Sequence, residues 1–174
     1  MTKPTPLQTR RGFTLIELMI AVAIIAILAA VAGVAFANQA KSARSKQAHA
    51  FLGAITANQA GRNPFIGLAA PNFCPGTVGA GAVDWDAACN TVMWNQLGVT
   101  PPRQTYYQYT VVSGGPGDDC TARTGNAAFC TTWTNGDRWW VAIARGDLDG
   151  DGTFSTFITS YSLGGVIIET DPRE

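Results

Sequence analysis

The first third of the chain has two successive hydrophobic patterns. Residues 18–37 are twenty consecutive residues without a charge, enough helix to span a hydrocarbon core of about 30 Å. The following residues are alanine-rich and polar, and a set of four apolar positions has the i, i+3, i+4, i+7 spacing of one buried helix face. These are Ala48, Phe51, Leu52 and Ile55. The pattern predicts a membrane-competent segment that continues as an amphipathic helix.

Gly61 and Pro64 are suitable stop signals for this helix. A helix from Phe13 to Ala60 has 48 residues and is about 72 Å long at the usual rise per residue. Residues 61–104 are rich in glycine, proline and alanine, and periodicity does not resolve them. Within them "TVMWNQLGV" predicts a short helix, with Trp94 and Leu97 packed inward.

Aromatic and β-branched runs separated by turn residues follow from residue 105. The runs cover 105–113, 129–134, 137–145, 153–161 and 166–170. Asn135-Gly136, the preferred two-residue hairpin turn, separates the second run from the third. We therefore predict an antiparallel sheet of about four or five strands, with Trp139 and Trp140 on opposite faces. A long N-terminal helix followed by such a sheet is an α+β fold.

Charge is balanced over the 174 residues, with 12 basic and 12 acidic side chains. Lys3, Arg10 and Arg11 precede the apolar segment, so the remaining chain has 12 − 3 = 9 basic residues against 12 acidic ones. The bulk of the chain therefore lacks a basic nucleic-acid footprint. The basic residues before the apolar segment predict a cytoplasmic N-terminus and an exported C-terminal part.

All four cysteines lie beyond the apolar segment, at Cys74, Cys89, Cys120 and Cys130. An even number of cysteines downstream of an export-type segment predicts two disulfides in an oxidising compartment. Three pairings are open, and the nearest-neighbour pairing would close two loop-rich stretches.

The apolar segment has three interpretations. A secretory signal could be cleaved after "AFA", residues 35–37, whose first and third residues are small, leaving Asn38 first. Arg10 and Arg11 are also compatible with a twin-arginine signal. Both classes have an apolar centre of about 7 to 15 residues, whereas this segment is longer and begins with an acid, Glu17. A charge in the bilayer centre costs about 3 kcal/mol, so Glu17 needs a partner.

The third interpretation depends on the order of residues. "GFTLIELMIAVAIIAILAAVA", from Gly12 to Ala32, resembles the N-terminal signature of type IV pilins and of the related pseudopilins of type II secretion systems. The resemblance implies the type IV pilin fold, cleavage after Gly12 by the prepilin peptidase, and N-methylation of Phe13. The chain would then comprise a leader (1–12), a transmembrane and polymerisation helix (13–37), an amphipathic helix (38–60) and a globular head (61–174).

The resemblance also implies a partner for Glu17. Cleavage creates an ammonium at Phe13, and Glu17 is expected to pair with the Phe13 amine of a neighbouring subunit. In a low-dielectric filament core this pairing offsets the burial of the charge, whereas a wrong register would leave both charges unpaired. Ala26 and Val34 stand where the family often has glycine and proline. Gly33 would weaken the helix by about 1 kcal/mol relative to alanine.

The function implied is that of a structural subunit, not an enzyme: a pilin inserted in the inner membrane as a precursor and then polymerised into an extracellular pilus. Expected partners are identical or related pilins, the prepilin peptidase, the assembly platform, the motor ATPase and the secretin. Family roles include adhesion, twitching motility and DNA uptake. A minor pilin and a periplasmic secretion pseudopilin are the alternatives within this class.

Two other classes of function are alternatives. A DNA-binding competence pilin would need an exposed basic and aromatic patch, and the sequence scatters its candidates, Arg103, Arg123, Arg138 and Arg145. DNA binding is therefore disfavoured. An exported enzyme with an uncleaved anchor would need a catalytic constellation. The sequence has no G-x-S-x-G elbow, P-loop or dinucleotide fingerprint, and its only histidine is His49 in the amphipathic helix.

"DLDGDG", residues 147–152, is the stretch with metal-like spacing. Asp147, Asp149 and Asp151 match positions 1, 3 and 5 of the calcium loop D-x-D-x-D-G, and Ser155 is a further candidate ligand. Position 12 should be a glutamate and is Ile158. A turn made of aspartate and glycine residues accounts for the same sequence without a bound ion. Calcium is therefore an expectation from a partial match.

Overall fold

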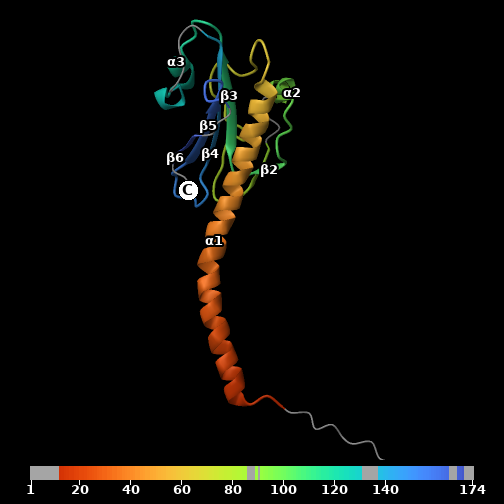
Figure 1. The fold of residues 1–174 in the computed structure, drawn as a ribbon, viewed down its shortest axis with the longest axis vertical. Coiled ribbons are helices and arrows are strands. Elements are labelled where there is room, and N and C mark those ends of the chain that lie inside the picture. Colours follow the sequence, from red (N-terminus) through yellow and green to blue (C-terminus); the bar gives the residue numbers. More distant parts are fainter. Residues whose placement is uncertain (1–11, 86–88, 90, 131–136, 165–167, 171–174) are drawn as a thin grey trace, which may run out of the picture. The chain divides into compact units, whose positions relative to one another are not determined.

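The computed structural model describes residues 12–85, 89, 91–130, 137–164 and 168–170 (Figure 1). The chain divides into two compact units, one up to Ala40 and one from Lys41 onward. Helix α1 spans Leu15–Gln59 and is helical through Gly33 and Val34. It ends close to the predicted stop signals because Gly61, with φ 74°, adopts the left-handed conformation that glycine tolerates.

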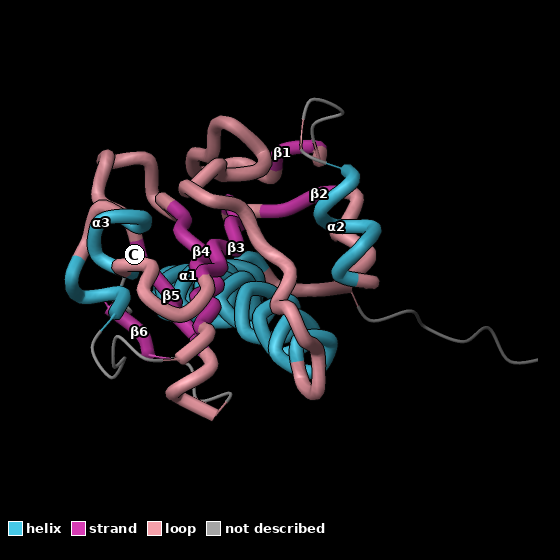
Figure 2. Tube along the Cα trace, turned by 90° about the horizontal axis from the view of Figure 1, so that it is seen from above, coloured by secondary structure: helices cyan, strands magenta, loops and turns pink. Residues whose placement is uncertain are grey.

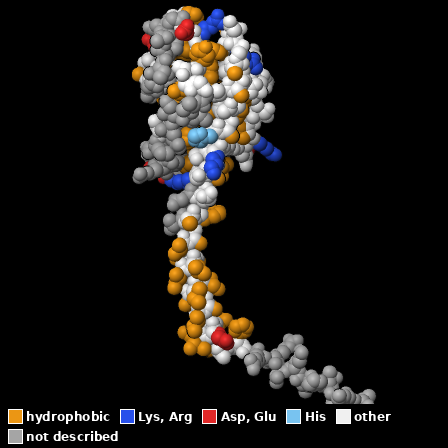
Figure 3. Space-filling view, viewed as in Figure 1, with side chains coloured by type: hydrophobic (Ala, Val, Ile, Leu, Met, Phe, Trp, Pro, Cys, Tyr) orange, Lys and Arg blue, Asp and Glu red, His pale blue; other side chains and the backbone are white. Residues whose placement is uncertain are grey.

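In the first unit the apolar side chains of α1 are exposed. Figure 3 shows hydrophobic side chains along the N-terminal half of the helix on the face in view. Within the described part of the chain, α1 is the one helix that is long and apolar enough to cross a membrane, by length and composition. A helix is suited to the hydrocarbon core of a membrane because its backbone hydrogen bonds are satisfied within the segment.

The second unit contains the predicted antiparallel sheet. In the part of the chain that the structure describes, the sheet has four strands in the order β3-β4-β5-β6, each antiparallel to the next. Their bounds are Gln108–Gly114 (β3), Trp139–Gly146 (β4), Ser155–Ser160 (β5) and Ile168–Thr170 (β6). A second ladder pairs β1, Val83–Asp84, with β2, Gln104–Thr105. Among the described residues this unit also has three short helices: α2, Thr91–Leu97; α3, Cys120–Thr124; and the 3₁₀ helix η1, Ala127–Cys130.

The two faces of the main sheet bury different parts of the chain. The predicted stripe of α1, namely Ala48, Phe51, Leu52 and Ile55, is buried together with Trp94, Leu97 and the even-numbered residues of β4 from Trp140. The opposite face buries Trp139, Val141 and Ile143 with Cys120. Trp139 and Trp140 thus face opposite sides, as predicted. Figure 2 shows α2 and α3 on different sides of this sheet.

Both disulfides join neighbouring cysteines along the chain. Cys74 is bonded to Cys89, with a Cα–Cα distance of 5.5 Å, and Cys120 to Cys130, with 5.9 Å. This is the nearest-neighbour pairing. Cys74 also exchanges two backbone hydrogen bonds with Tyr109 of β3, at 2.9 and 2.7 Å, so the first disulfide anchors the irregular segment to the edge of the sheet.

The strand predicted over 105–113 is interrupted. Thr105 ends β2, and β3 begins at Gln108. The reason is local: the Thr105 hydroxyl donates to the Tyr107 carbonyl and accepts from the Tyr107 N–H, both at 3.0 Å. These bonds occupy backbone groups that a continuous ladder would need.

The strand predicted over 129–134 was wrong at Phe129 and Cys130, which belong to η1. The Cys120–Cys130 disulfide holds Cys130 over one face of the sheet, and Phe129 packs there against the buried cluster. The neighbours of β4 are β3 and β5 instead. Residues 131–134 and the predicted Asn135-Gly136 turn lie outside the described residues.

The packed part of α1 is also fastened by polar contacts. The Lys41 ammonium lies 3.1 Å from an Asp149 carboxylate oxygen, and the Arg44 guanidinium stacks 4.4 Å from the centre of the Tyr106 ring. The ring of His49 lies edge-on to the ring of Phe157 in β5, with 4.8 Å between the ring centres. His49 therefore has a packing role in the described structure.

Truncating the buried helix stripe should destabilise the head. Leu52 is fully buried between α1 and the sheet, and Leu52→Ala should lower the free energy of unfolding by about 2–5 kcal/mol because it leaves a cavity. Urea denaturation of the detergent-solubilised chain measures this. Val92→Ala in α2 removes an exposed apolar side chain and should change the value by less than about 0.5 kcal/mol. Equal effects would contradict the packing described.

Candidate functional site

The predicted cleavage point lies in an exposed, non-helical segment. Gly12, Phe13 and Thr14 precede α1 without regular structure, and Phe13 is 89% exposed. An endopeptidase requires an accessible backbone outside regular secondary structure, and the Gly12–Phe13 bond lies in such a segment. The rest of the expected leader lies outside the described residues.

Glu17 has a local partner at the start of α1. Its carboxylate accepts hydrogen bonds from the Thr14 N–H at 3.0 Å and the Thr14 hydroxyl at 2.9 Å. The Thr14 hydroxyl in turn accepts from the Glu17 N–H at 3.3 Å. These reciprocal bonds form a capping box, which satisfies donors that the first turn of a helix leaves unpaired.

Sequence reasoning considered Glu17 only as an assembly residue and missed this cap. The signal was present, because Thr14 and Glu17 have the T-x-x-E spacing of a capping box. The single acid of the apolar helix is therefore accommodated in the isolated chain without a charged partner.

The acidic loop between β4 and β5 brings three carboxylates together. One oxygen each from Asp147, Asp149 and Asp151 lies within 4.8 Å of the other two. Asp147 is buried and accepts from the Gly150 N–H at 2.7 Å and the Gly152 N–H at 3.1 Å. Both glycines have positive φ, 84° and 90°, where other residues would be strained. The chain's own backbone thus orders the loop around Asp147.

Other groups around this loop bear on the calcium expectation. Lys41 already places an ammonium at Asp149 and relieves part of the repulsion. Ser155 is buried and directs its hydroxyl to the Gly146 carbonyl at 3.2 Å, with Tyr107 Oη at 3.5 Å. Ile158 is buried in the core and supplies no oxygen ligand. The three aspartates are the residues that could hold a hard cation, and calcium binding stays a prediction.

The four arginines considered for DNA binding have different environments. Arg145 is stacked on Phe73, 3.7 Å from the ring centre, and its Nε donates to Gln108 Oε1 at 2.7 Å. Burial lowers the pKa of this guanidinium. Arg123, inside the loop closed by the second disulfide, is paired with the Asp118 carboxylate, whereas Arg103 and Arg138 are exposed. The structure thus gives two of the four a contact within the head.

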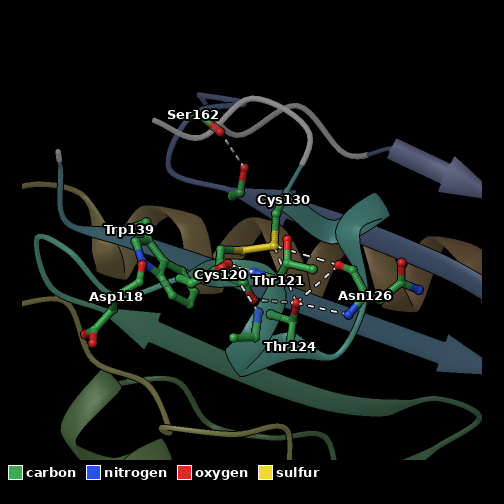
Figure 4. The surroundings of a disulfide bond; sticks show 11 residues. Asp118, Cys120, Thr121, Thr124, Asn126, Cys130, Trp139 and Ser162 are labelled. Carbon is green, nitrogen blue, oxygen red and sulfur yellow. Dashed lines mark hydrogen bonds between the residues drawn. A yellow bond between two sulfur atoms is a disulfide. The ribbon is translucent and has the colours of Figure 1, made fainter. Parts of the chain in front are cut away.

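Figure 4 shows how the second disulfide is embedded. Asp119 caps α3 by accepting from the Thr121 and Ala122 N–H groups at 2.8 and 3.2 Å, and the Trp139 indole N–H donates to the Asp118 carbonyl at 3.0 Å. The Asp118 carboxylate accepts from the Gly115 N–H at 2.8 Å and pairs with Arg123 at 2.8 Å. The Gly115 N–H, and secondarily Arg123, lower the pKa of Asp118.

Removing the carboxylate at the centre of the acidic loop should destabilise the head with or without calcium. Asp147→Ala leaves the Gly150 and Gly152 N–H groups without their acceptor, which should cost about 1–3 kcal/mol of unfolding free energy. The test is urea denaturation in buffers containing calcium or a chelator. If only the hydrogen bonds matter, Asp147→Ala should lower the unfolding free energy by the same amount in both buffers. If calcium binds, the wild type should be more stable in calcium, and Asp147→Ala should remove that difference.

Asp118 should contribute to the acid sensitivity of the fold. Because its folded-state pKa is lowered, its stabilisation is present above the unfolded value of about 4 and is lost as pH falls through the folded value. Melting temperatures measured from neutral to strongly acidic pH should fall less steeply for Asp118→Asn than for the wild type. Asp84→Asn, at an exposed carboxylate of β1, is the matched control and should follow the wild-type curve. Identical curves for all three proteins would remove this role of Asp118.

Comparison with known proteins identifies the N-terminal segment. The sequence model of the prokaryotic N-terminal methylation motif matches residues 7–33. No curated protein and no solved structure matches the chain significantly. The matched residues contain the Gly12–Phe13 bond, Glu17 and the first part of the exposed apolar helix, and they fit a membrane-anchored precursor. The chain therefore carries the type IV prepilin signature, which indicates a structural protein of the pilin-like or pseudopilin type.

Proposed function

We propose that the chain is a structural subunit of a type IV pilus-like extracellular filament. Its precursor is anchored in the inner membrane, cleaved after Gly12 by a prepilin peptidase, and polymerised through α1. The observation that carries this proposal is the methylation motif at residues 7–33, continued by a helix whose apolar side chains are exposed and whose one acid is Glu17. Such a helix needs lipid or other helices around it.

The proposed processing changes the electrostatics of the first helical turn. Cleavage before Phe13 creates an ammonium four residues before Glu17. This ammonium directly precedes Thr14, the other residue of the capping box. An ammonium adds a direct Coulomb attraction to the carboxylate that the uncharged Thr14 donors lack, and this attraction is large where the dielectric constant is low. The Phe13 ammonium of a neighbouring subunit can therefore compete with Thr14 for the Glu17 carboxylate.

This exchange of partners would set the register of the filament. In lipid, Glu17 can retain the Thr14 cap, whereas in a packed core of apolar helices an unpaired ammonium would be costly. Only a subunit at the correct axial position places its carboxylate beside its neighbour's amine. The apolar surface of α1 would supply affinity, and the charge pair would select the register.

The machinery follows from this proposal. A filament of this type requires identical or related pilins, the peptidase, an assembly platform with its motor ATPase, and an outer-membrane secretin. Adhesion and twitching motility are the roles that a surface filament would serve. A minor pilin and a periplasmic secretion pseudopilin would share the same processing. Shearing of intact cells separates these cases, because it releases abundant subunit only from an extracellular filament in which the chain is the major component.

Processing and the charge of Glu17 provide a direct test. Subunit sheared from cells should begin at N-methylated Phe13 by intact mass and N-terminal peptide analysis. Glu17→Gln keeps a capping-box residue but removes the charge, and should abolish most of the sheared filament while the precursor is still cleaved. Thr14→Ala is the matched control: it removes the cap, at about 1 kcal/mol, and should leave assembly largely intact.

The opposite pattern would contradict the proposal. If Thr14→Ala abolishes filaments and Glu17→Gln does not, Glu17 acts as a helix cap and not as an assembly charge. A mature chain that begins at Asn38 would show ordinary secretion and would remove both residues from the product.

A further inference from the structure

The head has a groove at the end where α1 stops. Two cavities of about 320 Å³ each share Phe65 and Tyr161 in their walls, so they adjoin, and together they are called the groove. The first is mainly apolar and includes Ala60 and Trp140 in its lining. The rings of Phe65 and Tyr161 lie 5.0 Å apart between the two cavities, and Tyr161 is 56% exposed.

The second cavity is polar and has a net positive charge. Its lining contains two guanidinium groups, Arg62 and Arg138, and one carboxylate, Asp137. Arg62 is held in place because its Nε donates to the Asn58 carbonyl and its Nη2 to the Leu97 carbonyl at 3.2 Å. Arg138 is exposed, and no carboxylate lies within 4 Å of it among the described residues. The groove thus combines an apolar half with a cationic half.

The acidic loop lies at the other end of the same two strands. β4 runs from Trp139, beside the groove, to Gly146, and β5 returns from Ser155 to Ser160, which lines the groove. Eight residues of strand separate the two ends by about 26 Å. At the loop end Phe154 is 39% exposed, and Asp151 is exposed with no cation within 4 Å in the described part of the chain.

We infer that the β4–β5 loop of one copy occupies the groove of the next copy. The Phe154 ring would lie in the apolar half, against Phe65 and Tyr161. The Asp151 carboxylate would face the guanidinium groups of Arg62 and Arg138. This inference rests on the proposed filament and identifies a contact between its heads.

The positions of loop and groove favour a second copy of this chain as the occupant. Every copy presents an acidic loop with an exposed aromatic ring at one end of the hairpin and a cationic groove with an aromatic wall at the other. A contact between different surfaces of identical subunits is heterologous, and when its rotation does not close into a ring it produces an open helical polymer. The contact between loop and groove is therefore of the heterologous kind that a filament requires.

Cysteine cross-linking in sheared filaments tests the contact. The native cysteines in the structure are all in disulfides, so new thiols can be introduced singly and in pairs. The double variant Asp151→Cys/Arg138→Cys should form a ladder of dimers, trimers and longer oligomers on a non-reducing gel after mild oxidation. Each single variant should remain monomeric. The control Asp151→Cys/Arg103→Cys moves the second thiol to an exposed arginine outside the groove and should give no ladder.

Charge reversal provides a second measurement. Arg138→Glu and Asp151→Arg should each lower the amount of sheared filament by about fivefold, since one exposed ion-pair contact contributes up to about 1 kcal/mol. The combined variant restores opposite charges and should recover most of the filament. Processing to Phe13 should be unchanged in all three, because the substitutions lie in the head.

The outcomes separate this inference from the proposed function. Filaments that form normally, but give no ladder and show no recovery in the combined variant, would overturn the loop-in-groove contact and leave the filament subunit intact. Dimers from a single-cysteine variant would indicate a symmetric contact instead and would also overturn it. Loss of methyl-Phe13 and of sheared filament in the wild type would reject the proposed function itself.

Discussion

The structure depends on the backbone hydrogen bonding of one long helix. Each peptide group of α1, from Leu15 to Gln59, can be satisfied within the helix itself, so the same element can stand in lipid and in water. Only the side chains need to change along its length. They are apolar and exposed in the first unit, and in the second they form a stripe that is buried against the sheet.

The head is organised around that stripe and around two disulfides. Leu52 and Ile55 are fully buried beneath strands β3 to β5, and α2 adds Trp94 to the same cluster. The other face of the sheet is covered by the segment that the Cys120–Cys130 disulfide closes. A disulfide stabilises such a loop-rich segment mainly by restricting the unfolded chain.

Electrostatics in this protein are local both at the start of the helix and near its middle, where Lys41 lies. The one acid of the apolar half is capped by Thr14, and the acidic loop is ordered by glycine N–H groups and faced by Lys41. Neither carboxylate group is left without donors. In the proposed filament both would serve a second purpose, since Glu17 could exchange its cap for a neighbour's ammonium and Asp151 could meet a neighbour's arginines. Local partners of modest strength leave such exchange accessible.

Much of this architecture follows from sequence because it depends on local periodicity. Spacing along the chain determines the helical stripe and the opposite orientation of Trp139 and Trp140. It also determines the short helix at residues 91–97 and the methylation motif. The T-x-x-E cap was equally local and was overlooked. Glu17 in particular stood out because a charge in an apolar helix requires a partner.

Tertiary structure decided the features that depend on residues distant in sequence. Phe129 and Cys130 belong to a run of residue types that favour strands, yet the Cys120–Cys130 disulfide holds this part of the chain over the sheet. Sequence places Arg145 at the end of a predicted strand as a charged residue, whereas in the structure its guanidinium stacks on Phe73 of another segment. Likewise, only the fold joins the end of α1 with Trp140 and Tyr161 to make a groove. Periodicity determines which face a residue takes, whereas the partners on that face are set by how the whole chain packs.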